Sequence, residues 1–249
     1  MLTITDVIAQ SWRFYVKNWG ALLTYMALLF LPTALLSALG LIGVAVDKFI
    51  PGSMLVSNII IFVIFLISLA FTFWAVAALT KGIADLLQNP ASHSWQSNFS
   101  AATPLLWPFA YTTILVGLVV GLGTLFFIIP GIIFTLWYIF AGYSVLLDGQ
   151  KGLAAMRFSK ALVVGRWWSV AVRVVVPGAL FGLLFKAVFS ALAFPVILFF
   201  HGATAIIIIN MLSAIGGALN IPLTLVAIII VYQDAKERPH VPTVIPTQK

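Results

Sequence analysis

The chain of 249 residues contains no cysteine, and only 8% of its residues are charged. Without cysteine it can form no disulfide, no thiolate metal site and no cysteine nucleophile. An ordinary soluble domain has about a quarter of its residues charged, so the low charge argues against that class. Only six residues are acidic, and paired carboxylates for acid–base catalysis are therefore hard to assemble.

Histidine is equally scarce. The three histidines, His93, His201 and His240, fall in three separate loops, and no HExxH pattern occurs. We therefore expect no metal site, no cofactor and no catalytic residue. The sequence predicts a protein that is not an enzyme, and an intramembrane enzyme is the function that its residues support least.

What the chain has in abundance is apolar side chains, at 63% of residues and a mean hydropathy of +1.16. Such a chain cannot cover itself with polar surface, so lipid must be its solvent. The pattern predicts an all-α polytopic membrane helical bundle, a single integral membrane domain with short interfacial helices. We expect six transmembrane spans, at residues 19–46, 58–80, 105–129, 131–147, 167–190 and 204–232.

The segments outside the spans differ in character. Residues 4–18 place Trp12 and Tyr15 on one face at helical spacing, which is typical of an interfacial helix; a soluble surface helix is the alternative. A weaker pattern of the same kind starts at Trp95. Residues 233–249 form a polar tail, for which we expect disorder after about Arg238.

The net charge of +7 sits mainly in short segments between spans, where it sets orientation and attracts anionic headgroups rather than nucleic acid. With six spans, ten Lys and Arg residues fall on the side of the termini and only Lys48 falls clearly on the other. The positive-inside rule then predicts that both termini are cytoplasmic. The ten are Arg13, Lys17, Lys81, Lys151, Arg157, Lys160, Arg166, Lys236, Arg238 and Lys249.

The longest interruption between the apolar segments is a basic segment at residues 148–166, which we call the elbow. It predicts a short cytoplasmic helix lying along the membrane, with Leu153, Met156 and Val163 in the acyl boundary. Its cations and the tryptophans that follow are our candidate lipid-headgroup residues: Lys151, Arg157, Lys160, Arg166, Trp167 and Trp168. Under the alternative interpretation, these charges only fix the topology.

Two cations lie inside the fifth predicted span, Arg173 and Lys186. A charge within the hydrocarbon is costly, so each cation needs a partner, a water-filled cavity or a side chain that can reach the interface. Both can snorkel to an interface. The alternative is a cavity between helices that holds an anionic group.

Between the third and fourth predicted spans stands Pro130–Gly131. Proline presets one φ angle and glycine supplies a positive one, so the pair predicts a tight turn. We expect this turn near the outer face, with Gly131 at positive φ.

Four stretches of the chain resemble one bacterial family: SWRFYVKNWGALLTYMALLFLP, IPGII, VLLDGQKGLAAMRFSKALVVGRWWSV and IIIVYQDAKER. The family is the membrane domain sometimes fused to glycerophosphoryl diester phosphodiesterase, with its standalone six-helix inner-membrane relatives. The resemblance covers nearly the whole chain. It implies a polytopic all-α protein of the bacterial cytoplasmic membrane, and it supplies no catalytic residue.

Two functions follow as hypotheses. The first is a membrane protein that binds or handles phospholipid, with anionic phospholipid as its partner, or that supports a membrane-associated protein. The second is a transporter or scramblase-like protein for a lipid or small amphiphile, which would use Arg173 and Lys186. A cavity joining these two cations would favour the second function.

Overall fold

The computed structural model describes residues 2–50, 53–88 and 94–238, and these residues form helices and connecting turns with no strand. His93, His240, Pro51, Gly52 and residues 239–249 of the predicted tail lie outside the described ranges. The α-helices are α1 Ile4–Lys17, α2 Trp19–Phe49, α3 Met54–Gln88, α4 Trp95–Ala102, α5 Leu106–Phe126, α6 Ile128–Trp137, α7 Ala141–Asp148, α8 Gly152–Val163, α9 Trp167–Phe199 and α10 Gly202–Glu237; a short 3-10 turn, Thr103–Leu105, precedes α5.

In the described part of the chain, six helical segments are long and apolar enough to cross a membrane, which confirms the predicted all-α polytopic class. They correspond in order to the six predicted spans, and the predicted interfacial helices appear as α1 and α4. Thr3 caps α1 in a capping box with Asp6, in which each side chain accepts from the other residue's backbone N–H. The chain therefore has the character of a multi-pass membrane protein.

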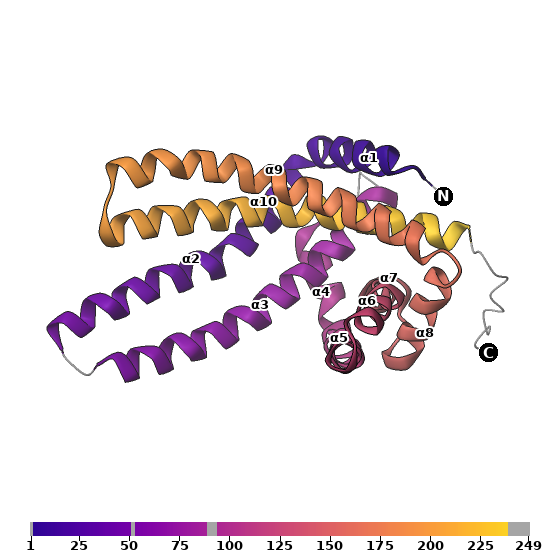
Figure 1. The fold of residues 1–249 in the computed structure, drawn as a ribbon, viewed down its shortest axis with the longest axis horizontal. Helices are drawn as coiled ribbons and strands as arrows, with labels where there is room; N and C mark the ends of the chain where they lie inside the picture. The colour runs from indigo at the N-terminus through magenta and orange to yellow at the C-terminus, as the bar shows by residue number, and fades with distance from the viewer. Residues whose placement is uncertain (1, 51–52, 89–93, 239–249) are drawn as a thin grey trace.

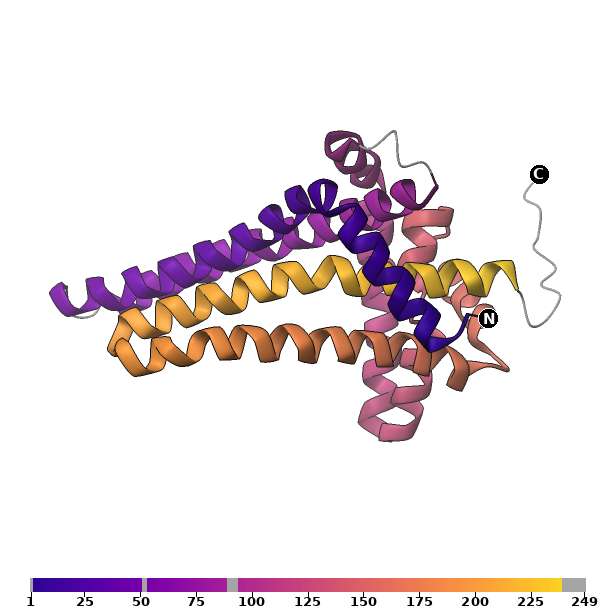
Figure 2. The same cartoon turned by 90° about the horizontal axis from the view of Figure 1, so that it is seen from above.

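The four longest helices, α2, α3, α9 and α10, extend side by side toward what we call the far end, where Phe49 and Phe199 lie (Figure 1). Residues near both described termini gather at the opposite end, which we call the terminal end. There α1 lies across α9 and α10, as the view from above shows (Figure 2). Each long helix of 31 to 36 residues exceeds the roughly 20 needed for one crossing.

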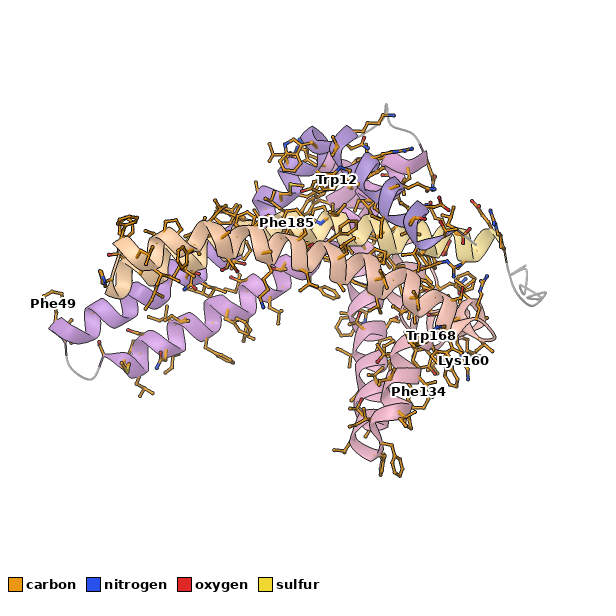
Figure 3. All side chains as sticks on the ribbon, turned by 45° about the horizontal axis from the view of Figure 1, so that its top comes forward. Trp12, Phe49, Phe134, Lys160, Trp168 and Phe185 are labelled. Carbon is orange, nitrogen blue, oxygen red and sulfur yellow. The ribbon has the colours of Figure 1, made fainter. Side chains whose placement is uncertain are left out.

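The hairpin of α5 and α6 runs across the direction of the four long helices. In Figure 1 α5 is seen almost end-on, whereas α9 and α10 lie in the plane of the view. Figure 3 shows the same hairpin, marked by Phe134, pointing across the long helices rather than along them toward the end at which Phe49 lies. The turn of this hairpin therefore does not lie beside the far ends of the other helices, where the sequence had predicted it.

The buried core lies toward the terminal end. Its largest fully buried side chains include Tyr25, Leu79, Phe140, Leu223 and Tyr232, which come from α2, α3, the α6–α7 turn and α10. Helix α10 is central, because it packs against α9, α2, α1 and α3. Toward the far end the same helices expose long apolar faces, as expected of surface that meets lipid.

The predicted turn at Pro130–Gly131 is wrong in its position. The chain reverses at Phe127, which has extended backbone (φ −156°, ψ 136°). Pro130 and Gly131 follow it and lie in the first turn of α6. Gly131 is not among the glycines with positive φ. Proline is tolerated in the first turn of a helix, where its missing N–H would have no partner within the helix.

The predicted fourth span is interrupted, and the predicted tail begins later than expected. Helix α6 ends at Trp137 and α7 begins at Ala141, so residues 138–140 form a turn inside the span. Residues 233–237 continue α10 rather than opening a tail. The stretch 188–203, whose arrangement the sequence left open, is α9 up to Phe199, followed by a break of two residues before Gly202.

Candidate functional site

The turn between α8 and α9 places Arg166 where α8, α9 and α10 meet. Gly165 has a φ of 82°, a value that L side chains rarely adopt, and this lets the chain turn sharply after Val164. Arg166 then stands at the N-cap of α9, and its backbone N–H donates to the Val163 carbonyl at 3.0 Å. The glycine thus sets where the guanidinium can reach.

The Arg166 guanidinium holds the end of α10. Its Nε donates to the Leu162 carbonyl at 2.7 Å, Nη2 to Ala235 at 2.7 Å and Nη1 to Arg238 at 2.5 Å. The last carbonyls of a helix have no partner within it, so these bonds satisfy two of them and join α9 to α10. The sequence assigned Arg166 a headgroup role alone, whereas the structure also gives it a structural one.

Arg173 reaches the start of the chain instead of snorkelling alone to an interface. Its Nε donates to the Leu2 carbonyl at 2.5 Å, and Nη1 donates to the Ser169 carbonyl at 2.8 Å and to the Ser169 hydroxyl. Leu2 lies just before the amphipathic helix α1. Arg173 therefore lies beside the start of α1, a contact that its place in the fifth predicted span did not indicate.

Arg166 and Arg173 line one cavity of about 530 Å³, which we call the Arg166–Arg173 cavity. They are seven positions apart, which is two helical turns and thus the same face of α9. No carboxylate is among its described lining residues, which are Ile4, Gly165, Arg166, Trp167, Trp168, Ser169, Val172 and Arg173.

The electrostatics of this cavity favour an anion. Burial lowers the pKa of Arg166, Asp234 acts in the opposite direction, and the positive charge of Arg173 lowers it further. Asp234 is engaged elsewhere: it accepts from the Leu2 N–H at 3.1 Å and pairs with Arg238 at 3.6 Å. Two like charges therefore share a partly buried space whose described lining includes no carboxylate.

Trp167 and Trp168 form the outer wall of the cavity. Their rings meet edge to face with centroids 5.5 Å apart, and the side chains remain 46% and 67% exposed. Exposed tryptophans are enriched at the level of lipid headgroups, where an apolar ring with a polar N–H is well solvated. Trp12 on α1 and Trp168 both lie toward the terminal end, away from Phe49 (Figure 3).

The other elbow cations do not join the cavity. Lys151, at the N-cap of α8, and Arg157, within α8, are exposed, and the Arg157 Nε donates to the Leu153 carbonyl at 3.4 Å. The Lys160 Nζ lies 4.1 Å from the centroid of the Trp137 ring, a cation–π contact. The candidate set from the sequence is therefore divided between the cavity and the surface of α8.

The apolar face of α8 packs on protein and not on lipid, which corrects the prediction for the elbow. Met156 and Val163 are buried, and only Leu153 is exposed as expected. Ser159 is buried as well, and its hydroxyl donates to the Trp137 carbonyl at 2.7 Å and accepts from the Phe140 N–H at 3.1 Å. This hydroxyl thus satisfies the two backbone groups freed by the break between α6 and α7.

Sequence reasoning missed Ile4 and Ser169 as lining residues, and it separated Arg173 from Arg166. The spacing Arg166, Ser169, Arg173 follows the i, i+3, i+7 pattern of one helix face, and this signal was present in the sequence. The contact between Ile4 and the start of α9 is long-range, and no local pattern indicates it.

The remaining candidates lie apart from this cavity. Lys186 lies on the exposed part of α9 beside a second cavity, and Pro130 and Gly131 belong to α6. His201 is exposed at the N-cap of α10. Within the described ranges no three His, Asp or Glu side chains come together as metal ligands.

No protein-family model, curated protein or solved structure matches the chain. The family resemblance therefore stays a prediction, and the geometry of the site is the basis for a function.

Proposed function

We propose that the chain is a non-enzymatic, multi-pass protein of a bacterial cytoplasmic membrane that binds anionic phospholipid in the Arg166–Arg173 cavity. One observation carries the proposal. Two guanidinium groups line a single cavity that has no carboxylate among its described lining residues and is bordered by two exposed tryptophans.

A lipid phosphate suits this cavity in charge and in geometry. A guanidinium has five N–H donors, of which Arg166 uses three for carbonyls. Hydrogen bonds to a charged phosphate are shorter and stronger than those to neutral acceptors. A phosphate between the two side chains would also relieve their mutual repulsion, while the tryptophan rings would lie against the glycerol and upper acyl region.

The cations of α8 support the same proposal at longer range. A basic residue close to an anionic leaflet contributes about 1 kcal/mol of attraction. Lys151 and Arg157 belong to the elbow, which ends at Arg166, and both side chains are exposed. They are therefore available for this role. Together with the ten-to-one distribution of Lys and Arg, they support an orientation in which the terminal end faces the cytoplasm.

Transport remains the second hypothesis, and the packing along α9 favours binding over it. The cavity at Arg173 and the cavity at Lys186 share no described lining residue. Val174, Pro177 and Phe181, which lie between the two cations along α9, are buried. A route for a headgroup from one cation to the other would have to pass these packed side chains.

The family relationship is part of the proposal. We propose that the chain is a relative of the membrane domain found with glycerophosphoryl diester phosphodiesterase, and that it can support a membrane-associated partner. The basic elbow, Asp148 to Arg166, is the stretch that carries most of the resemblance.

The binding proposal is tested by removing one cavity cation and comparing retained lipid. Arg173→Gln removes a charge from the cavity, and Arg157→Gln removes the same charge from the surface of α8 as a matched control. Native mass spectrometry of purified protein would measure retained phosphatidylglycerol and cardiolipin. We expect Arg173→Gln to lose about tenfold or more in retention, since a charged hydrogen bond contributes about 1.5–3 kcal/mol.

Arg157→Gln should lose less, at most about fivefold, because one basic residue near an anionic surface contributes about 1 kcal/mol. Equal losses in both variants would mean that the charges act only as a diffuse basic surface, and no loss in either would contradict the proposal. Arg173→Lys keeps the charge but lacks the planar set of guanidinium donors, so it separates the effect of charge from that of geometry. Thermal unfolding of each variant would show whether the contact to Leu2 was needed for folding.

A further inference from the structure

A second cavity, of about 390 Å³, lies between α9 and α10, well away from the terminal end. We call it the Lys186 groove. Its apolar walls are Phe185 and Phe189, whose rings stack at 6.5 Å. Its polar lining is Lys186, Ser190, Ser213 and Asn220. Figure 3 shows Phe185 part-way along α9, between Trp168 and the far end.

The groove lies at the depth of the hydrocarbon. Lys186 is thirteen positions from Arg173 and thirteen from Phe199, which is about 20 Å in each direction at 1.5 Å per residue. Arg173 meets the start of the chain just before α1, and Phe199 ends the helix at the far end. Because the hydrocarbon core is about 30 Å thick, Lys186 is near its middle when α9 spans it.

Lys186 has no counter-ion within the part of the chain that the structure describes. It makes no hydrogen bond and no ion pair with a described residue, and its side chain lies beside the groove. None of the six acidic residues of the sequence falls within 182–193 or 209–220, the stretches of α9 and α10 that line the groove. An ionisable group at this depth indicates a functional site.

The groove has room for a ligand and groups to orient it. A Cβ added at Gly182 or Gly217 would meet no atom within 4 Å, so these glycines leave open space. At Gly216 an added Cβ would lie 2.8 Å from Phe189 Cδ2, so that ring is fixed against α10 as a wall. The Asn220 side-chain oxygen accepts from Thr224 at 3.4 Å, which orients its amide.

The geometry points to a membrane amphiphile with one anionic headgroup and one acyl chain, bound with its headgroup at Lys186. The headgroup is a carboxylate or a phosphate monoester, which Ser190, Ser213 and Asn220 can hydrogen-bond. The chain lies along Phe185 and Phe189 and enters sideways from the bilayer. The volume falls in the range of sites for small molecules, about 300–1,000 Å³.

A second copy of this chain does not fit the groove in the same way. Its own spans at this depth offer no acidic side chain that could pair with Lys186. The polar groups also extend over about two turns of α10, from Ser213 to Asn220, which is more than one inserted carboxylate can use. A small amphiphile uses the lysine, the hydroxyls and the recess together.

The test is photo-crosslinking of the purified full chain with two probes. One is a diazirine-bearing oleic acid, and the other is a diazirine-bearing lysophosphatidic acid with the same chain. Peptide mapping should place the crosslinks in 182–193 and 209–220. Labelling by either probe supports the site and identifies the headgroup, and no labelling of these stretches by either probe overturns the inference.

The variants separate charge from packing. Lys186→Gln should lower labelling about tenfold or more, as expected for loss of a charged hydrogen bond, while Lys186→Arg should retain most of it. Unlabelled oleate should compete and oleyl alcohol should not. Equal labelling of Lys186→Gln, or equal competition by the alcohol, would overturn the role of the charge. Arg173→Gln should label normally, so this result is independent of the phospholipid proposal.

Discussion

Gly131 shows how one missing side chain controls the approach of two helices. A Cβ at this position would lie 2.8 Å from the Thr124 Cα, a backbone atom of α5 that cannot move alone. We expect Gly131→Ala to destabilise the protein by about 1–3 kcal/mol, the usual cost of overpacking. Thermal unfolding in detergent would measure the difference.

Gly121 on α5 provides the matched control. A Cβ there would meet nothing within 4 Å, so Gly121→Ala adds only helix propensity. It should leave stability unchanged or raise it by up to about 1 kcal/mol. If both alanines had the same effect, close packing at Gly131 would not be the cause.

Sequence reasoning found the residues of this crossing but not their conformation. The pair Pro130–Gly131 is typical of a tight turn between elements, but proline is equally common at the start of a helix. What decides between them is the contact of Gly131 with Thr124, which needs the folded hairpin. Arg166 is a similar case: its charge was evident, but its three carbonyl partners come from the packing of α8 and α10.

Among the elements, α8 has a role that its amphipathic pattern did not reveal. It fills the break in the fourth apolar segment with the Ser159 hydroxyl, which bonds both Trp137 and Phe140. Ser159→Ala would leave a buried carbonyl and a buried N–H unsatisfied, at a cost of about 1–3 kcal/mol. We also expect faster hydrogen exchange at the Phe140 amide, measurable by mass spectrometry.

Ser100, an exposed residue of α4, is the control for this change. Ser100→Ala should affect neither unfolding nor exchange, because its side chain lies at the surface. Unchanged exchange at Phe140 in Ser159→Ala would contradict the bridging role.

The existence and order of the helices were predictable, because a long apolar segment in lipid must satisfy its own backbone N–H and C=O groups, and a helix does so within the segment. The partner of an amphipathic face was not. An apolar stripe on α8 looks the same in sequence whether it packs on acyl chains or on α5 to α7, and Met156 and Val163 are in fact buried in protein. For the same reason the direction of the α5–α6 hairpin could not be predicted from its hydropathy.

For the molecule as a whole, orientation is the first prediction to test. The bias of Lys and Arg predicts that the terminal end is cytoplasmic. The chain has no cysteine, so Ser53→Cys and Gln150→Cys each introduce one thiol. An impermeant thiol reagent added to intact cells should label Ser53→Cys and leave Gln150→Cys unlabelled. The reverse pattern would overturn the orientation.

The α5–α6 hairpin gives a second test by the same method. Six parallel spans would bring the hairpin turn to the side of Ser53, whereas in the structure the hairpin runs across the long helices (Figure 3). Phe126→Cys, at the end of α5, should therefore resist the impermeant reagent in intact cells. Labelling equal to that of Ser53→Cys would show that the hairpin crosses the bilayer alongside the long helices.

The concentration of the core at one end has a mechanical consequence. Between the α2–α3 pair and α10 lies a cavity of about 430 Å³, lined by residues such as Thr33, Thr72 and Asn210. The α2–α3 pair and the α9–α10 pair thus share a packed core near the terminal end and are partly separated by this cavity beyond it. A small change in the angle between the two pairs would displace their far ends most, because those ends lie farthest from the packed core.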